Sequence, residues 1–209
     1  MERFETAQAV EPHAETSADH VAILLLGEAV VLVVADGAGN SRRGVDAAAA
    51  VVRAVQAAMV ERTDLTRPDA WSHLLEQCDH LLASTGHGGE TTAVAACVTE
   101  DRIIGASVGD SELWLIHGDS HTVVTQHQRR KPLLGSGEAL PVYFDLPWTG
   151  GTLLAGTDGL FKYADAHRIR AVASSPDLSA SARELAALPR FASGGLPDDV
   201  GLALCRPRY

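Results

Sequence analysis

The sequence of 209 residues contains only three cysteines, Cys78, Cys97 and Cys205. They are odd in number, lie far apart and form no Cys-x-x-Cys pair, which excludes a disulfide framework and a cysteine-based zinc site. Buried, reduced cysteines are typical of a cytoplasmic protein, and we expect that location. Glutamates among the first eleven residues support it, because a signal peptide does not carry acidic residues before its apolar region.

Positive charge is also scarce. The chain has 17 lysines and arginines but 27 aspartates and glutamates, so its formal net charge is −10. A chain this acidic repels phosphate backbones and anionic lipid headgroups, so we expect neither nucleic acid nor a membrane as a partner. A membrane-spanning run is missing as well. The longest apolar stretch, residues 21–35, is interrupted by Gly27 and Glu28 and is shorter than the roughly 20 residues that cross a bilayer.

The composition that remains is ordinary for a globular protein, with 46% apolar and 21% charged residues. This balance excludes disorder, collagen and coiled coil. A domain usually takes about 100–200 residues, so we expect residues 1–209 to form a single domain with a substantial core. We also expect a monomer.

Apolar residues alternate along the chain between strand-like and helix-like patterns. Short runs rich in Val, Ile and Leu predict strands, and apolar residues at three- and four-residue steps predict helices with one buried face. The expected strands are 21–26, 30–35, 91–98, 102–108, 112–117, 121–125, 152–157 and 200–205. The expected helices are one after an N-cap at Ser41, one from Pro68 to the break at 86–89, and two near 164–174 and 179–188. Tight turns between strands favour antiparallel pairing, and we expect a sandwich of sheets with helices outside.

Four aspartates stand at the ends of expected strands, each beside a residue that permits a sharp turn: Asp36, Asp110, Asp158 and Asp198. Each alone is explained as a turn residue, because Asp and Gly are common in turns. Their repetition is informative, since the strand ends of a sandwich can bring four carboxylates together. Crowded carboxylates repel one another unless a cation neutralises them, and oxygen-only ligands favour Mg²⁺ or Mn²⁺ over zinc.

Five short motifs follow one another in the chain. They are Val-Val-Ala-Asp-Gly-Ala-Gly at 33–39, Gly-Glu-Thr-Thr-Ala at 89–93, Val-Gly-Asp-Ser at 108–111, Thr-Asp-Gly-Leu at 157–160 and Asp-Asp at 198–199. In this order and spacing they resemble the metal-dependent Ser/Thr protein phosphatases of type 2C over nearly the whole chain. The resemblance implies an α+β fold, a four-layer αββα sandwich of two mainly antiparallel sheets flanked by helices. It also implies hydrolysis of phosphoserine and phosphothreonine on phosphoproteins, with a cognate Ser/Thr kinase.

The same resemblance implies a binuclear Mn²⁺ or Mg²⁺ centre with a weaker third ion. By position, Asp36 would bridge two ions, and the carbonyl of Gly37 would bind one of them. Asp158 and Asp198 would complete the second site, and Asp110 would share the third ion with Asp158. Asp36, Asp158 and Asp198 are thus expected to serve catalysis by setting the metal spacing and polarising water.

The chain departs from the family pattern on the substrate side of this centre. The family's Asn-Glu-Asp triplet corresponds to residues that end at Asp19, which would reach water around the first ion, but Ala18 replaces its glutamate. The family's phosphate-binding arginine is Ala14 here. Asp199 replaces an asparagine and adds negative charge near the metals, and the flap region, 126–149, is short. These changes predict an active metal centre with unusual substrate handling.

Because Ala14 removes the usual donor to phosphate, we predict that Arg42 or Arg43 binds phosphate instead. Both follow Asp36 closely, at the expected start of a helix, and a helix N-terminus also favours anions. The alternative is that both arginines face solvent. The basic run 129–131 is expected to be a solvated loop, with substrate docking as its alternative.

Two other functions stay open at this level. Ala14 and Ala18 are compatible with a degenerate phosphatase that binds phosphoproteins as a regulator. Residues 105–109 match the Gly-x-Ser-x-Gly elbow of α/β hydrolases, with Ser107 as nucleophile, but a strand is expected where that motif needs a helix. The glycine-rich residues 37–39 are a weak candidate for a dinucleotide loop, because the third glycine is missing.

Overall fold

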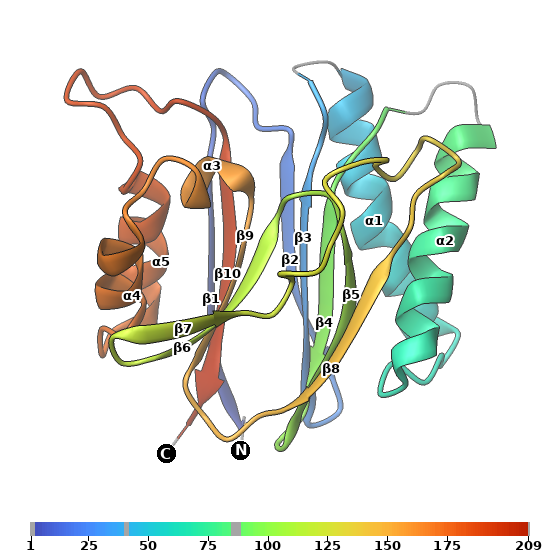
Figure 1. Ribbon diagram of the computed structural model, residues 1–209, viewed down its shortest axis with the longest axis horizontal. Coiled ribbons are helices and arrows are strands. Elements are labelled where there is room, and N and C mark those ends of the chain that lie inside the picture. The colour runs from blue at the N-terminus through green and yellow to red at the C-terminus, as the bar shows by residue number, and fades with distance from the viewer. Residues whose placement is uncertain (1–2, 40–41, 85–88, 209) are drawn as a thin grey trace.

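The computed structural model describes residues 3–39, 42–84 and 89–208, which form two five-stranded sheets packed face to face (Figure 1). The first sheet contains, in spatial order, β1 (Phe4–Glu11), β10 (Val200–Pro207), β9 (Thr152–Gly156), β6 (Glu112–His117) and β7 (Ser120–Val123). The second contains β2 (Asp19–Leu26), β3 (Ala29–Asp36), β4 (Ala93–Val98), β5 (Arg102–Val108) and β8 (Val142–Pro147). Every pairing between these strands is antiparallel.

Helices cover the outer face of each sheet (Figure 1). On the second sheet lie α1 (Arg42–Val60) and α2 (Pro68–Ser84), and on the first lie α4 (Ala166–Ala173) and α5 (Leu178–Ala187). A single turn, α3 (Asp158–Phe161), follows β9 at the end of the sandwich. The expected αββα architecture with two antiparallel sheets is confirmed.

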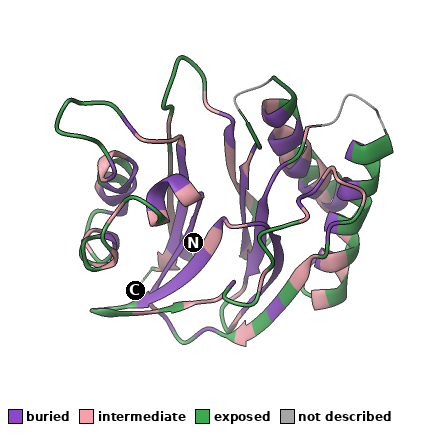
Figure 2. Ribbon diagram, turned by 45° about the horizontal axis from the view of Figure 1, so that its top comes forward, coloured by how far each residue is buried: buried purple, intermediate pink, exposed green. Residues whose placement is uncertain are grey.

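The core has three layers because the central strands are apolar on both faces. In β3, Val31 and Val33 point toward α1 and α2, whereas Leu32 and Val34 point into the space between the sheets. A third cluster joins the outer face of the first sheet to α4 and α5. Alternate side chains of a strand point to opposite faces, so a strand covered on both sides is buried along its whole length, as Figure 2 shows.

The three- and four-residue spacing of Val45, Ala48, Val52, Val55 and Met59 predicts one apolar face for α1, and the buried face of the helix is rotated slightly from it. Ala47, Val51 and Ala58 are fully buried, whereas Val52 and Met59, which the spacing placed on the buried face, are only partly buried. Alanine lets the helix approach the sheet closely, and the larger side chains then fill the flanks. The expected N-cap Ser41 and most of the break at 86–89 lie outside the described residues.

Two strands were not anticipated from the sequence, β1 and β8, and both lie at an edge of a sheet. An edge strand pairs on one side only, and these two are mostly half-buried or exposed. They therefore lack the continuous apolar run by which the central strands were recognised.

The structure excludes two of the alternative sites. Ser107 lies within β5, and the strand β6 follows where an α/β hydrolase has a helix. Residues 37–39 follow a strand whose neighbours β2 and β4 are both antiparallel to it, whereas a dinucleotide loop belongs to a parallel β-α-β unit.

The three cysteines are free and buried, and burial raises the pKa of Cys78 and Cys97 to about 11 and that of Cys205 to about 12. Such thiols are unreactive at neutral pH, as expected for core residues. Among the helices of the described residues, none has the length and apolarity needed to cross a bilayer.

Candidate metal centre

Four aspartates from the two sheets meet at one end of the sandwich. Asp36 ends β3, Asp110 lies just beyond β5, Asp158 begins α3 directly after β9, and Asp198 precedes β10. All four line one cavity of about 330 Å³. The expectation that strand ends bring these carboxylates together is confirmed, and α3 marks this end in Figure 1.

Asp199 lines the cavity too, and one more carboxylate, Asp19, lies beside it. Asp19 opens β2 and pairs directly with Asp36 across the antiparallel β2–β3 ladder. Its side chain is buried and accepts a hydrogen bond of 2.7 Å from Thr157 Oγ1. Thr157 Oγ1 in turn accepts a hydrogen bond of 3.0 Å from Gly201 N, so the first sheet fixes a carboxylate that belongs to the second.

The crowding changes the acidity of these groups. Burial, followed by the charge of Asp36, raises the pKa of Asp19 from 3.8 to about 9. Burial, followed by the charges of Asp158 and Asp198, raises the pKa of Asp36 to about 7. Burial and the charge of Asp110 raise the pKa of Asp158 as well. Without a cation, this end of the sandwich therefore favours protonated carboxyls.

Two threonines of the Gly-Glu-Thr-Thr motif hold the Asp36 loop in place. Asp36 N donates to Thr92 Oγ1 at 3.0 Å, and Asp36 O accepts from Thr92 N at 2.9 Å and from Thr91 Oγ1 at 2.8 Å. The motif is visible in the sequence, but these contacts are not, because they join residues more than 50 positions apart.

Gly37 is required at its position by space. A Cβ atom there would lie 2.3 Å from the carbonyl oxygen of Gly44 in the first turn of α1, and that backbone atom cannot move away without displacing the helix. The amide of Gly37 donates to Ala18 O at 3.3 Å. The chain can therefore present the peptide of Gly37 to the cavity only with glycine here.

The donor set fits hard, hydrated cations. All the charged ligands are carboxylates, which favour Mg²⁺ or Mn²⁺. Within the described residues, no three His, Cys, Asp or Glu side chains are already arranged as a ligand set for one ion. Mg²⁺ usually keeps several waters in its shell, so a site for it does not require a complete set of protein ligands in place beforehand.

The structure separates the two predicted phosphate-binding arginines. Arg42 is exposed and lines a cavity of about 550 Å³ together with Ala14, Asp198 and Asp199. This cavity adjoins the aspartate cavity, since both are lined by Ala18, Asp198 and Asp199. Arg43 is exposed too but lines neither cavity.

Asp199 has a structural role that the sequence did not reveal. Its Oδ1 accepts a hydrogen bond of 2.6 Å from His13 N, and its Oδ2 accepts one of 2.7 Å from Ala18 N. The carboxylate thus ties both ends of the segment 13–18, which forms a wall of the Arg42 cavity, to the start of β10. Its charge also contributes to the raised pKa values of Asp19 and Asp36, as expected for an acidic residue near the centre.

We expect Asp199→Ala to lower the free energy of unfolding by about 1–3 kcal/mol, because the backbone amides of His13 and Ala18 lose their hydrogen bonds to a charged carboxylate. Asp199→Asn keeps one acceptor oxygen and should cost less. Urea unfolding of the metal-free protein measures both changes, with Asp46→Ala as an exposed control on α1. Equal stability of Asp199→Ala and Asp46→Ala would contradict the anchoring role.

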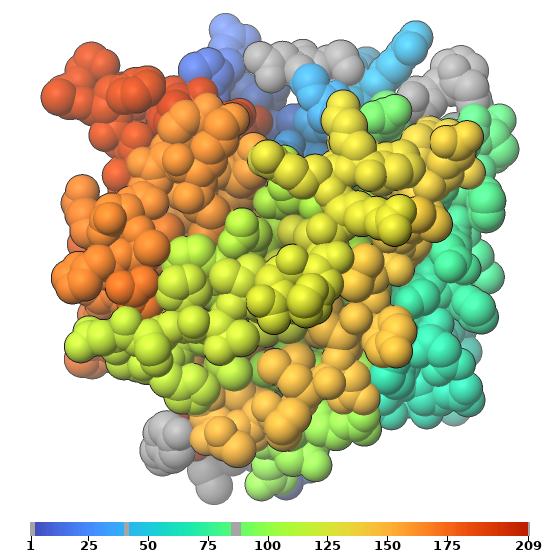
Figure 3. All heavy atoms as spheres, viewed as in Figure 1, coloured from blue at the N-terminus to red at the C-terminus, as the bar shows by residue number. Residues whose placement is uncertain are grey.

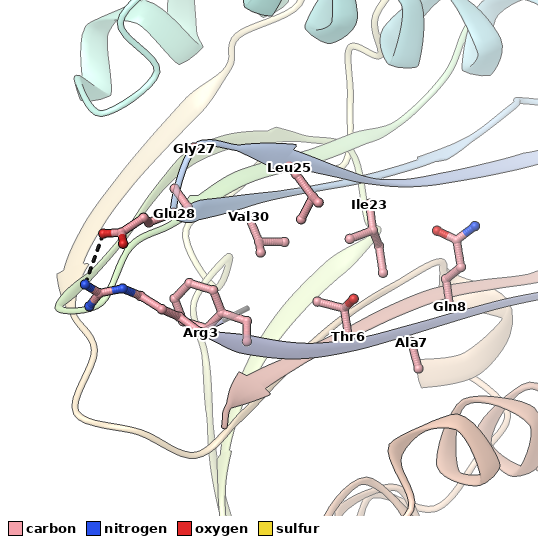
Figure 4. A pocket seen from close by; sticks show the side chains of 11 residues that line it. Arg3, Thr6, Ala7, Gln8, Ile23, Leu25, Gly27, Glu28 and Val30 are labelled. Carbon is pink, nitrogen blue, oxygen red and sulfur yellow. Dashed lines mark ion pairs between the residues drawn. The ribbon is translucent and has the colours of Figure 1, made fainter. Parts of the chain in front are cut away.

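A larger cavity, of about 670 Å³, lies between the edge strands β1 and β2. Figure 4 shows its lining, with Ile23 and Leu25 on one side, Thr6 and Gln8 on the other, and an ion pair of 3.0 Å between Arg3 and Glu28. No aspartate lines it. It lacks the clustered acidic groups of the aspartate cavity and is a poorer candidate for chemistry.

The fold is that of the bacterial serine/threonine phosphatases. A bacterial serine phosphatase superposes with a TM-score of 0.86 and 18% identity, covering 98% of each chain. The catalytic domain of the Ser/Thr phosphatase PstP, in complex with two manganese ions, gives 0.83 and 20%, also covering 98% of each chain. Stp1 from Staphylococcus aureus gives 0.83 and 18%, covering 100% of this chain and 96% of that one.

The sequence profile of protein phosphatase 2C matches residues 14–135, which is more than half of the chain. The chain therefore belongs to the protein phosphatase 2C family, as the motifs predicted, and its enzyme class is that of the Ser/Thr protein phosphatases. A search of curated proteins with the sequence gave no significant match.

Proposed function

We propose that the protein hydrolyses phosphoserine and phosphothreonine on phosphoproteins at the aspartate cavity, using two Mn²⁺ or Mg²⁺ ions. Asp36 and the Gly37 carbonyl would hold one ion, and Asp36, Asp158 and Asp198 would hold the other. The observation that carries the proposal is the convergence of these carboxylates, from both sheets, on one cavity, where the pKa values of Asp36 and Asp158 are raised. Family membership and the manganese-bound relative support it.

The ions, when bound, supply positive charge for the phosphoryl oxygens and a water acidic enough to ionise near neutral pH. The protein's own residues set the positions. Thr91 and Thr92 fix the loop of Asp36, and the Gly37 peptide lies against Gly44 of α1. Asp19, oriented by Thr157, would accept a hydrogen bond from water near the first ion and help to orient it for attack on phosphorus.

Further inferences accompany this proposal. A phosphoprotein substrate requires a Ser/Thr kinase that made it, and we infer such a kinase. We also infer a cytoplasmic location and a monomeric enzyme. Finally, we infer one domain over 1–209, since β1 and β10, far apart in the sequence, pair along eight residues within one sheet.

Phosphate release from a phosphothreonine peptide, with Mn²⁺ and with a chelator, tests this function. We expect steady turnover with Mn²⁺ and none with the chelator. Ala14 and Ala18, both at this end of the molecule, motivate the alternative of a regulator that binds phosphoproteins without hydrolysing them. Tight binding of the peptide without turnover at any Mn²⁺ concentration would replace the enzyme by that regulator.

Mn²⁺ is expected to stabilise the protein by about 2.7 kcal/mol at 100 times its Kd, because it binds the folded state. At a fixed Mn²⁺ concentration the effect should grow with pH, because the Kd falls as the carboxylates lose their protons. Asp19 and Asp36 have raised pKa values in the folded state, so the folded protein holds more protons than the unfolded chain above pH 4. The metal-free protein therefore loses stability as pH rises from about 4 to about 9, and Mn²⁺ replaces those protons.

Thermal unfolding at pH 5.5 and 8, with and without Mn²⁺, measures this prediction. The rise in Tm with Mn²⁺ should be larger at pH 8. An unchanged Tm in millimolar Mn²⁺ at both pH values would contradict the metal centre.

A further inference from the structure

The segment that follows β7 is fixed to the end of the sandwich that carries the aspartates. Gly109 N donates to Arg129 O at 3.1 Å, and Gln128 Nε2 donates to Ser111 O at 2.7 Å. Further along, Leu134 exchanges two backbone hydrogen bonds with Thr91, of 2.9 and 3.1 Å. Figure 3 shows this segment in yellow on the surface of the molecule. Its backbone therefore has a defined place beside the metal centre.

This placement brings Arg130 onto Asp110. Arg130 Nη2 and Nε lie 3.1 and 3.3 Å from Asp110 Oδ2. The Arg130 side chain is 76% exposed, and the Asp110 side chain is 30% exposed. Both also line a cavity of about 410 Å³ together with Asp158 and Lys162. The ion pair with Asp110 thus holds the Arg130 side chain at the cavity. When that ion pair breaks, the exposed side chain can turn into solvent.

Arg130 acts electrostatically on both carboxylates predicted for the third ion. It is paired with Asp110, and its charge opposes the rise in pKa that burial and Asp110 impose on Asp158. Lys162, one turn beyond Asp158, acts in the same direction. A divalent ion between Asp110 and Asp158 would have to displace the guanidinium and would remain near two positive side chains.

We propose that Arg130 is a built-in competitor for the third metal ion. By neutralising Asp110, it leaves the chain with two firmly bound ions and a third that binds only when the guanidinium moves away. This inference rests on the proposed metal centre at Asp36. It concerns a side chain of the short flap region, for which the sequence suggested only a solvated loop or substrate docking.

The test counts Mn²⁺ ions bound per chain by equilibrium dialysis and measures their Kd values by calorimetry, at low salt and without substrate. Arg130→Gln removes the charge but keeps the side-chain length. Arg129→Gln is the matched control, because it removes the same charge from the neighbouring position, where the contact to the centre is a backbone carbonyl. Both positions are exposed, so both variants are expected to fold.

We expect two tightly bound ions and one weakly bound third ion in the wild type, and a Kd for the third ion about tenfold lower in Arg130→Gln, since a nearby unit charge opposes a divalent ion. Adding Asp110→Asn to Arg130→Gln should remove this gain in affinity, and Arg129→Gln should behave as the wild type. High salt should narrow the difference.

The two proposals fail in different ways. An unchanged third Kd in Arg130→Gln, or an equal gain in Arg129→Gln, with two ions tightly bound throughout, would overturn the competitor role alone. A wild-type chain that binds no Mn²⁺ would overturn the metal centre and the competitor role together.

Discussion

Asp36→Asn is expected to lower phosphate release from a phosphothreonine peptide by about a thousandfold or more at saturating Mn²⁺. Asp36 is central in the cavity, and its acidity responds to the charges of Asp110, Asp158 and Asp198. A group placed there can bind two ions at once, and its loss affects both sites. Metal assistance is worth several kcal/mol of barrier, and each 1.36 kcal/mol is tenfold in rate.

Asparagine keeps the size of the side chain and leaves the backbone bonds of Asp36 to Thr91 and Thr92 intact, so the fold should persist. The same variant should lose most of the rise in Tm with Mn²⁺ and should be more stable than the wild type without metal at pH 8. Asp119→Asn, in the exposed turn before β7, is the matched control. Activity within tenfold of the wild type would contradict the assignment of Asp36.

The central strands could be predicted from the sequence because they are covered on both faces. β3 and β4 are uninterrupted apolar runs, and their burial is nearly complete. The edge strands β1 and β8 could not be predicted in the same way. Most of their residues are half-buried or exposed, so polar residues interrupt the apolar run that marks a central strand. An apolar run in the sequence indicates a strand that is buried on both faces, and β1 and β8 are buried only in part.

Among the predicted metal ligands, some could be located from the local sequence, whereas the contacts of others depend on the tertiary structure. Asp36, Asp158 and Asp198 could be found because each stands beside a strand that is itself recognisable. Asp19 was suggested by the family pattern, and its contact with Thr157 depends on how the two sheets are stacked. That stacking joins residues 138 positions apart and has no signature in the local sequence.

The contacts of the acidic residues with loops were beyond prediction for the same reason. From the sequence, Asp199 is only one more negative charge. In the structure it accepts hydrogen bonds from two backbone amides of the segment 13–18. Arg130 reads as part of a solvated loop, yet it pairs with Asp110. In both cases the partner comes from a segment without regular structure, whose path is set by tertiary hydrogen bonds.

Arg42→Ala is expected to raise the KM for a phosphothreonine peptide about tenfold or more, with a smaller change in kcat. Arg42 begins α1 and lines the cavity that shares Ala18, Asp198 and Asp199 with the metal centre. Ala14, on the same cavity, stands where the family pattern has its phosphate-binding arginine. A charge-assisted hydrogen bond is worth about 1.5–3 kcal/mol, and its loss in both the ground state and the transition state appears mainly in KM.

Arg43→Ala is the matched control, because it removes the same side chain one position along α1 from a residue that does not line the cavity. Arg42→Lys should recover part of the loss, since lysine keeps the charge without the two-pronged geometry. The Mn²⁺-dependent rise in Tm should be the same in all three variants, because Arg42 is not among the proposed metal ligands. A wild-type KM in Arg42→Ala, Arg43→Ala and the double variant would contradict phosphate binding at the start of α1 and would direct the search to the basic run 129–131.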